Sequence, residues 1–140
     1  SSFNRDLLKG KHDFDTSGDS GDTFKIALFT SSASLGAATT NYSTSNTSGS
    51  AYSAGGKALT NTGVGLTSTT AFTDFSDISW TSASFTANGA MIYNTTTDGG
   101  SNTTDAVCII AFGSDKTATN GTFEIQFPAN DSSNAIIRLA

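Results

Sequence analysis

Hydrophobic and polar residues alternate along much of the chain after residue 22, which is the pattern of half-buried β-strands. Segment 24–29, for example, alternates Phe, Ile and Leu with Lys and Ala and then ends in a further Phe. Stretches rich in Gly, Ser, Thr, Asn and Asp separate such segments and favour turns. The strands predicted in this way are 24–29, 57–60, 72–80, 85–87, 89–93, 106–112, 123–127 and 135–139. They indicate an all-β fold, a β-sandwich or barrel-like antiparallel domain of about seven to eight strands, as a single domain over residues 1–140.

Three local signals describe how these strands continue and join. The apolar positions switch parity between Trp80 and Phe85, which predicts a bulge or a tight corner at residues 81–84. The dipeptide Asn120-Gly121 is a strong hairpin signal and predicts a turn. The uninterrupted apolar run at 106–112 predicts a central strand covered on both faces.

Residues 1–12 are expected to form an N-terminal helix or arm. Phe3, Leu7 and Leu8 are expected on one face of the helix. Ser2 is a suitable N-cap, and Gly10 is a suitable stop. A helix of about two turns is not stable alone, so it must dock on the body of the protein or on another protein.

Residues 31–56 are rich in Ser, Thr, Asn and Gly and are expected to form a long polar loop, with an edge strand near Tyr42 or Tyr52. Loops of this length in a compact domain are usually functional or mobile. Together with Phe3, Leu7 and Leu8 of the helix, Tyr42 and Tyr52 are therefore candidate partner-binding residues.

Charge and composition narrow the classes of partner. The net charge is −5, and only 7 Lys and Arg are present, so nucleic acid and anionic membrane surfaces are not expected partners. No apolar stretch is long enough to span a bilayer, and no segment has the pattern of a signal peptide, so we expect synthesis in the cytoplasm. The single cysteine, Cys108, excludes a disulfide framework and is interpreted as a small buried apolar residue.

The ionisable residues offer little for catalysis. His12 is the only histidine, no nucleophile motif accompanies it, and it is interpreted as a surface residue without a role. Glu124 is the only glutamate and alternates with apolar neighbours, so it should face solvent. Asp74 and Asp77 would point to opposite faces of a strand and do not form a carboxylate pair. We therefore expect a protein without enzymatic activity.

One acidic segment has the beginning of a calcium-binding loop. Asp13, Asp15, Ser17 and Asp19 supply oxygen ligands at alternate positions, with Gly18 at the sixth position of the pattern. The match ends there, because the twelfth position is Phe24 where a bidentate Glu is needed. The expectation is a plain acidic turn and no cofactor, with calcium at these four residues as the alternative.

Several segments, in order along nearly the whole chain, resemble a family of small virion structural proteins of tailed bacteriophages. They are DTFKIAL at 22–28, YSAGGK at 52–57, GAMIYN at 89–94, the ending at 123–139 and the amphipathic start at 3–12. This chain differs from the family pattern by extra residues between His12 and Thr23. The resemblance implies a structural role in the virion and transfers no catalytic residues.

The resemblance leads to a capsid decoration (cement) protein as the leading hypothesis. Such a protein would bind and stabilise the shell of major capsid protein, or contact other virion proteins, and would act as a homo-oligomer in the assembled particle. A tail, neck or baseplate component is the alternative within the virion. A carbohydrate-binding attachment module is a further alternative, which requires a row of exposed aromatic side chains, whereas Trp80, Phe85, Tyr93 and Phe112 are interpreted as core.

Overall fold

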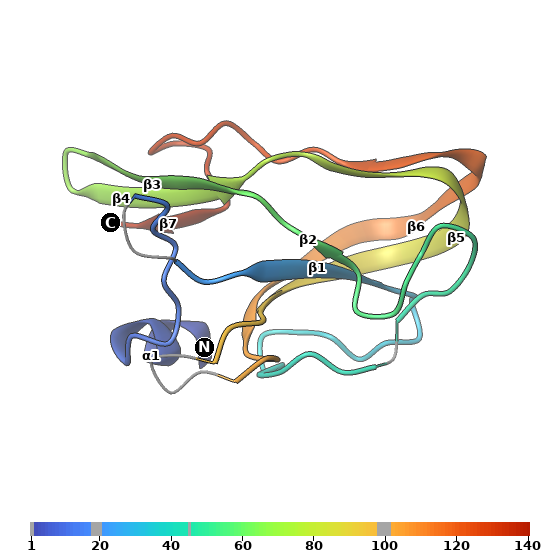
Figure 1. Cartoon of the computed structure of the whole chain (residues 1–140), viewed down its shortest axis with the longest axis horizontal. Coiled ribbons are helices and arrows are strands. Elements are labelled where there is room, and N and C mark those ends of the chain that lie inside the picture. Colours follow the sequence, from blue (N-terminus) through green and yellow to red (C-terminus); the bar gives the residue numbers. More distant parts are fainter. Residues whose placement is uncertain (1, 18–20, 45, 98–101) are drawn as a thin grey trace.

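Seven strands in two antiparallel sheets and one short helix make up the described part of the chain, which comprises residues 2–17, 21–44, 46–97 and 102–140 of a computed structural model (Figure 1). In chain order the elements are α1 (Ser2–Leu8), β1 (Phe24–Phe29), β2 (Lys57–Ala58), β3 (Asn61–Thr67), β4 (Thr70–Phe75), β5 (Ile78–Asn94), β6 (Ala106–Ile125) and β7 (Ile137–Leu139). The main sheet has the order β2-β1-β5-β6, and the small sheet has the order β3-β4-β7. The prediction of an all-β, sandwich-like domain is confirmed. Within these ranges no helix is long and apolar enough to cross a membrane.

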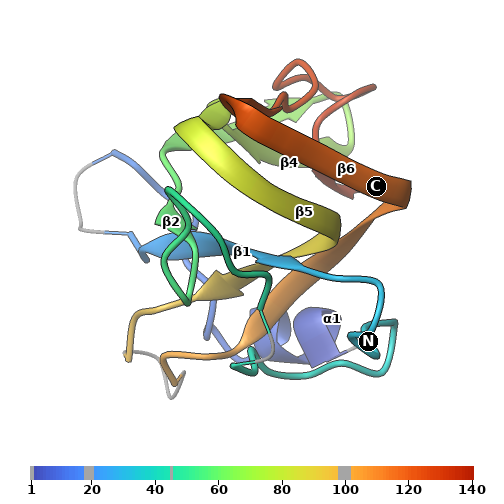
Figure 2. The same cartoon turned by 90° about the vertical axis from the view of Figure 1, so that its right-hand side faces the viewer.

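The longest pair of strands, β5 and β6, forms a ribbon that curves back on itself (Figure 2). Its pairing extends from Ile78 opposite Ile125 to Tyr93 opposite Ala106. Four shifts in register interrupt it, and such irregularities bend a ribbon and increase its twist. The shift between Trp80 and Ala83 confirms the bulge that the parity of the apolar residues predicts.

Asn120-Gly121 does not form the predicted hairpin turn, because β6 continues through it. Asn120 has a φ of 50°, the left-handed conformation that makes Asn-Gly favourable in tight turns. The same conformation serves here in a bulge, since β6 advances from Ala118 to Gly121 while β5 steps from Phe85 to Ala83. The sequence therefore indicates correctly where the left-handed backbone lies. Pairing with the neighbouring strand β5 determines that it forms a bulge and not a hairpin turn.

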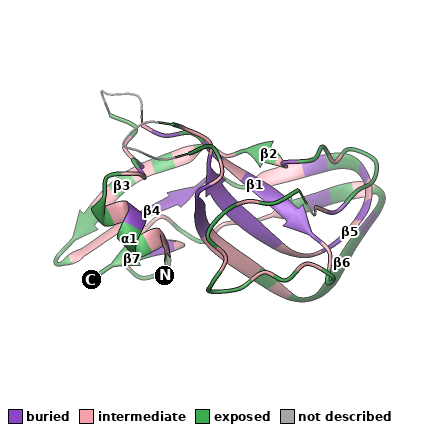
Figure 3. Ribbon diagram, turned by 90° about the horizontal axis from the view of Figure 1, so that it is seen from below, coloured by how far each residue is buried: buried purple, intermediate pink, exposed green. Residues whose placement is uncertain are grey.

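The two faces of β1 are both buried, which Figure 3 shows as a purple strand in the centre of the molecule. One face contributes Phe24, Ile26 and Leu28 to the core between the sheets. Phe24 is fully buried, with its ring stacked on Phe14 at 4.6 Å between centroids. The opposite face places Phe29 in a second apolar cluster, so a further segment must cover the main sheet from that side.

The apolar run 106–112 is not a central strand, because β6 is the last strand of the main sheet. Its side chains do reach both apolar clusters, with Ile110 packed on the first and Ile109 on the second. The prediction was correct for the faces and wrong for the position. The pattern of apolar side chains depends on what covers the two faces of a strand. It does not depend on whether another strand pairs with the backbone at its side, so it cannot distinguish a central strand from an edge strand.

The remaining differences concern boundaries. Strand β3 was not predicted, because Gly63 and Gly65 are typical of turns; both lie within the strand, next to a shift in register. The predicted strand 72–80 is divided at residues 76–77 between β4 and β5. The predicted strand at 123–127 ends at residue 125, as the last part of β6, and 135–139 is shortened to β7.

Candidate interaction surface

The N-terminal helix docks on the body of its own chain. Phe3 and Leu7 pack against the main core, but Leu8 is 91% exposed. The expectation that these three residues share one face is therefore wrong for Leu8, which lies one position beyond the packed face. Since the helix is already covered by its own chain, its packing supplies no reason for an outside partner at Phe3 or Leu7.

Ion pairs hold this helix against the turn that precedes β6. Asp6 is 1% exposed and receives two hydrogen bonds of 2.9 Å from the guanidinium of Arg5, which lowers the pKa of Asp6. Lys11 lies between two carboxylates, 3.9 Å from Asp6 and 3.5 Å from Asp105. Asp105 also accepts the backbone N–H of Asn102 at 2.9 Å. The charged groups at this end therefore serve to join segments that are distant in sequence.

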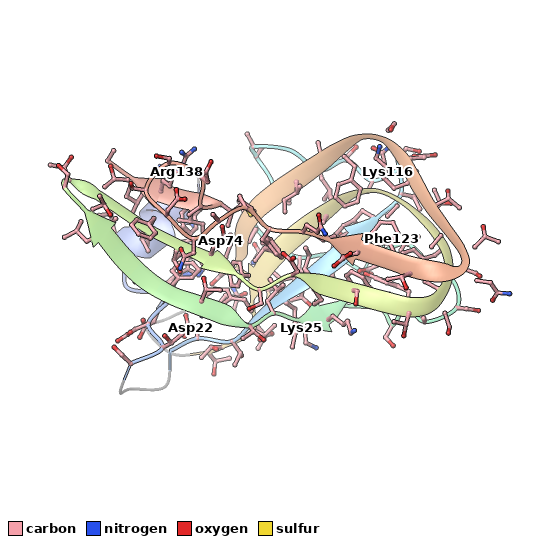
Figure 4. The ribbon with its side chains drawn as sticks, turned by 90° about the horizontal axis from the view of Figure 1, so that it is seen from above. Asp22, Lys25, Asp74, Lys116, Phe123 and Arg138 are labelled. Atoms are coloured by element: carbon pink, nitrogen blue, oxygen red, sulfur yellow. The ribbon has the colours of Figure 1, made fainter. Side chains whose placement is uncertain are left out.

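Asn94, the last residue of β5, fastens the segment that follows the helix. Its side chain is fully buried, and its amide nitrogen donates to the carbonyl of Lys11 at 2.9 Å and to Asp22 Oδ2 at 2.5 Å. The same nitrogen lies 3.2 Å from Nδ1 of His12. Asp22, labelled in Figure 4, also accepts the backbone N–H of Asp13. Asn94 thereby joins the N-terminal segment to the main sheet.

His12 is buried, not a surface residue as the sequence suggested. It is 5% exposed, with its ring stacked on Phe3 at 5.5 Å and Nδ1 beside the Asn94 amide. Burial lowers the pKa of His12 below its ordinary value of 6.5, while the nearby carboxylates of Asp105 and Asp6 raise it and Lys11 lowers it. The burial could not be predicted, because the contact with Asn94 spans 82 positions of sequence.

Neutral His12 makes the fold sensitive to mild acid. Because its folded-state pKa lies below 6.5, the unfolded chain binds a proton first as the pH falls, and stability is lost from about pH 6.5 downward until His12 also titrates in the folded state. We expect the melting temperature to fall between about pH 7.5 and pH 5.5 and the fall to be smaller in His12→Gln. The lowered pKa values of Asp6 and Asp15 affect stability only below about pH 4, outside this window. Parallel melting curves for the two proteins across the window would contradict the assignment to His12.

The described residues of the long segment 31–56 pack on both faces of the main sheet, with Tyr42 on the second apolar cluster and Tyr52 on the core between the sheets. Tyr42 stacks on Tyr93 of β5 with the centroids 4.4 Å apart. Tyr52 Oη accepts the backbone N–H of Leu28 at 2.8 Å, and its hydroxyl donates to Asn46 at 2.9 Å. Residues Ala33, Leu35 and Tyr42 cover the second apolar cluster. The segment thus covers apolar clusters of its own chain, and the rings of both tyrosines pack inside it, Tyr42 on Tyr93 and Tyr52 on Trp80 and Phe85.

The expected edge strand in this segment is reduced to two single bridges, Asn41 with Asp105 and Ser50 with Ser84, in its described residues. Its return to the main sheet requires glycine at position 56, where φ is 76°. A Cβ at Gly56 would lie 1.8 Å from the carbonyl oxygen of Ile26. This close approach allows β2 to pair with β1 immediately afterwards.

The acidic segment 13–17 uses its carboxylates to fix its own backbone. Asp13 accepts the N–H of Asp15 at 2.8 Å, and Asp15 accepts the N–H and the hydroxyl of Ser17 at 2.9 and 2.8 Å. Asp19, the fourth candidate calcium ligand, lies outside the described residues. Among those that are described, no group of three His, Cys, Asp or Glu side chains converges as a metal site would require.

The other carboxylates have different surroundings. Asp74 is 1% exposed and accepts the backbone N–H groups of Phe75 at 2.8 Å and Ile136 at 3.0 Å, which fastens the chain end that leads into β7 (Figure 4). Asp77 accepts the N–H of Phe127 at 2.7 Å. Glu124 is exposed, as predicted.

The edge of β6 is the most distinctive surface left open. A groove of about 500 Å³ lies between the two halves of this bent strand, with Ile110 and Phe112 from one half and Phe123 and Ile125 from the other as apolar walls and Lys116 and Glu124 as charged groups. Figure 4 shows Lys116 and Phe123 on the curved part of the ribbon. In the described part of the chain no strand pairs with this side of β6, so its backbone can accept an added strand.

Cys108 lies farther along the same edge strand and is half-buried. Burial raises the pKa of its thiol to about 12. The thiol is therefore protonated at neutral pH and acts as a small apolar group, but it is half-buried and not fully buried as the sequence suggested.

Comparisons of this chain with protein-family models, with curated proteins and with solved structures find no match.

Proposed function

We propose that this chain is a structural subunit of a bacteriophage virion, and specifically a capsid decoration protein that binds the major capsid protein shell. The observation that carries the proposal is the open edge of β6 with its apolar groove. A sheet edge of this kind is suited to strand addition, in which backbone hydrogen bonds supply affinity and pockets for alternate side chains supply specificity. The order of segments that resembles small phage virion proteins supports the same class.

The surface composition suits a subunit that binds in many copies. Charged residues make up 14% of the chain, and its polar surface consists largely of Ser, Thr and Asn. These short side chains lose little conformational entropy when a neighbour immobilises them. Weak contacts of this kind become effective when the symmetry of a shell repeats them.

No observation favours the carbohydrate-binding alternative. All of the aromatic residues lie in the described ranges, and none of them is exposed. The row of exposed aromatic rings that this alternative requires is therefore not formed. A tail, neck or baseplate location shares the fold and the resemblance and is distinguished by the experiment below.

The copy number of the chain in purified phage particles tests the proposal. A decoration protein should approach the abundance of the major capsid protein on a quantitative gel, because it covers the shell. A ratio of only a few copies per particle would assign the chain to the tail, neck or baseplate. Absence of the chain from purified particles would overturn the virion role as a whole.

A substitution in the β6 groove tests the surface. Thr122 is exposed and lines the groove, and a lysine at a sheet edge opposes strand pairing. We expect Thr122→Lys to reduce re-binding to particles stripped of this protein by about tenfold, as loss of one interface contact commonly does. Thr119→Lys is the matched control, since Thr119 is exposed on the same strand and does not line the groove. Equal binding by the two variants would remove β6 from the contact.

A further inference from the structure

The four large apolar side chains that are exposed in the described part of the chain gather at one end of the molecule. They are Leu8 at 91%, Leu66 at 70%, Val64 at 58% and Leu139 at 44% exposure. This end holds α1 and the small sheet, at the left of Figure 1. A groove of about 470 Å³ lies between them, with Leu7, Phe14, Val64 and Leu139 among its walls. We call these four exposed side chains the end patch.

The register of the small sheet explains why its apolar side chains are bare. Val64, Thr73 and Ile137 lie side by side across its three strands, and the body of the protein covers the last two of them. The next row on the same face is Leu66, Ala71 and Leu139, nearer the tip of the hairpin. The sheet therefore extends one row beyond the core that covers it and keeps apolar residues in that row.

The exposed apolar residues of the small sheet lie next to one another. Val64 and Leu66 are two positions apart on β3, and Leu139 lies in the same row as Leu66 through Ala71 of β4. Single exposed apolar residues are ordinary on protein surfaces, but neighbouring ones mark an interaction site. Rings are absent from the patch, so a sugar-binding platform does not account for it.

The charges beside the patch favour a second copy of the chain as the partner. Lys9 is exposed and follows Leu8, whereas Asp13 and Asp15 line the groove. When Leu8 of one copy enters the groove of the other, Lys9 comes next to carboxylates of opposite sign, and a twofold axis repeats the contact. A twofold interface uses the same patch on both copies, so a surface that carries a projecting leucine, an apolar groove and complementary charges can pair with itself.

We propose that two copies of this chain form a symmetric dimer through the end patch, with Leu8 of each copy in the groove of the other. The dimer is independent of the virion role, because it uses a surface at the other end of the molecule from the bend of β6 (Figure 4). Failure to dimerise would leave the copy-number experiment unaffected, and the reverse also holds.

Sedimentation equilibrium of the full chain over a concentration series tests the dimer. We expect dimers in the wild type and a dissociation constant raised at least about tenfold in Leu66→Glu and in Leu8→Glu, since each places a carboxylate in the buried centre of the interface. Thr119→Glu adds the same charge to an exposed position outside the patch and should leave the dimer intact. A circular-dichroism melt of each variant confirms that it is folded. Leu8, on the surface of α1, supplies a readout even if Leu66→Glu alters the small sheet.

Two results would overturn the proposal. One is a wild-type protein that is monomeric at every concentration. The other is a dimer whose dissociation constant is the same in Leu8→Glu, Leu66→Glu and Thr119→Glu, which would place the interface elsewhere. A dimer that weakens on raising the salt concentration and in Lys9→Glu would support the pairing of Lys9 with the acidic residues of the groove.

Discussion

Phe24→Ala is expected to lower the free energy of unfolding by about 3–5 kcal/mol, the largest effect of any single truncation considered for this protein. Phe24 is fully buried, stacks on Phe14 and meets Phe75 edge to face at 5.7 Å. These contacts join β1, β4 and the segment that follows the helix, so removing the ring leaves a cavity at the point where three parts of the chain meet. Urea or guanidinium unfolding, monitored by tryptophan fluorescence of Trp80, measures the change.

Phe127→Ala is the matched control for this prediction. Phe127 is half-buried, lies after the end of β6, and contacts Phe75 with 5.9 Å between the ring centroids. Because less apolar surface is removed from water at this position, its truncation should cost roughly half as much or less. Equal losses for the two variants would show that Phe24 has no special place in the core.

Asn94→Ala is expected to lower the free energy of unfolding by about 2–4 kcal/mol, since the buried groups around it lose their common donor. Those groups are the Lys11 carbonyl, Nδ1 of His12 and the carboxylate of Asp22. The loss should appear first in the N-terminal segment, as faster hydrogen exchange and earlier proteolysis at residues 2–17 than in the sheets.

Asn88→Ala is the control for Asn94. Asn88 lies on the same strand, and its amide makes an exposed hydrogen bond of 2.8 Å to Asp115. Its removal should change stability by no more than about 0.5 kcal/mol. If Asn88→Ala and Asn94→Ala destabilise the protein equally, or if the N-terminal segment is protected equally in both, the fastening role of Asn94 is wrong.

Strand content could be predicted from the sequence because alternation of apolar residues is a local property. The segment 24–29 and the bulge at 81–84 were located by parity alone, and both are present. The alternation of apolar and polar residues does not show which other segment of the chain covers each face of the sheet. Phe29 and Met91 are buried on the second face of the main sheet because Ala33, Leu35 and Tyr42, which belong to a mostly polar stretch, pack against it.

The errors have a common physical origin in contacts between distant segments. Asn120 has the same left-handed backbone in a hairpin turn and in a bulge, and the continuation of β5 beside it decides between them. The burial of His12 depends on Asn94. The burial of Asp6 depends on the docking of α1 against the rest of the chain, which cannot be predicted from the local sequence. The β6 groove and the end patch could not be predicted from the sequence either. Each is a surface on which no other segment of the described chain pairs or packs, and that depends on the whole fold.

The two open surfaces are the ones to which we assign the proposed contacts. We propose the β6 groove as the site for an added strand and the end patch as the site for a second copy. The residues first chosen as partner contacts, Tyr42 and Tyr52 among them, make their contacts inside the chain. We therefore assign the proposed partner binding to surfaces that the fold leaves exposed.

Electron cryo-microscopy of the intact phage particle tests the central claim, a decoration role on the capsid, most directly. We expect density for this two-sheet domain at repeated positions on the outer face of the head, with the β6 groove against the major capsid protein. Density for the domain only in the tail, neck or baseplate, or a head with no density that this domain fits, would contradict it.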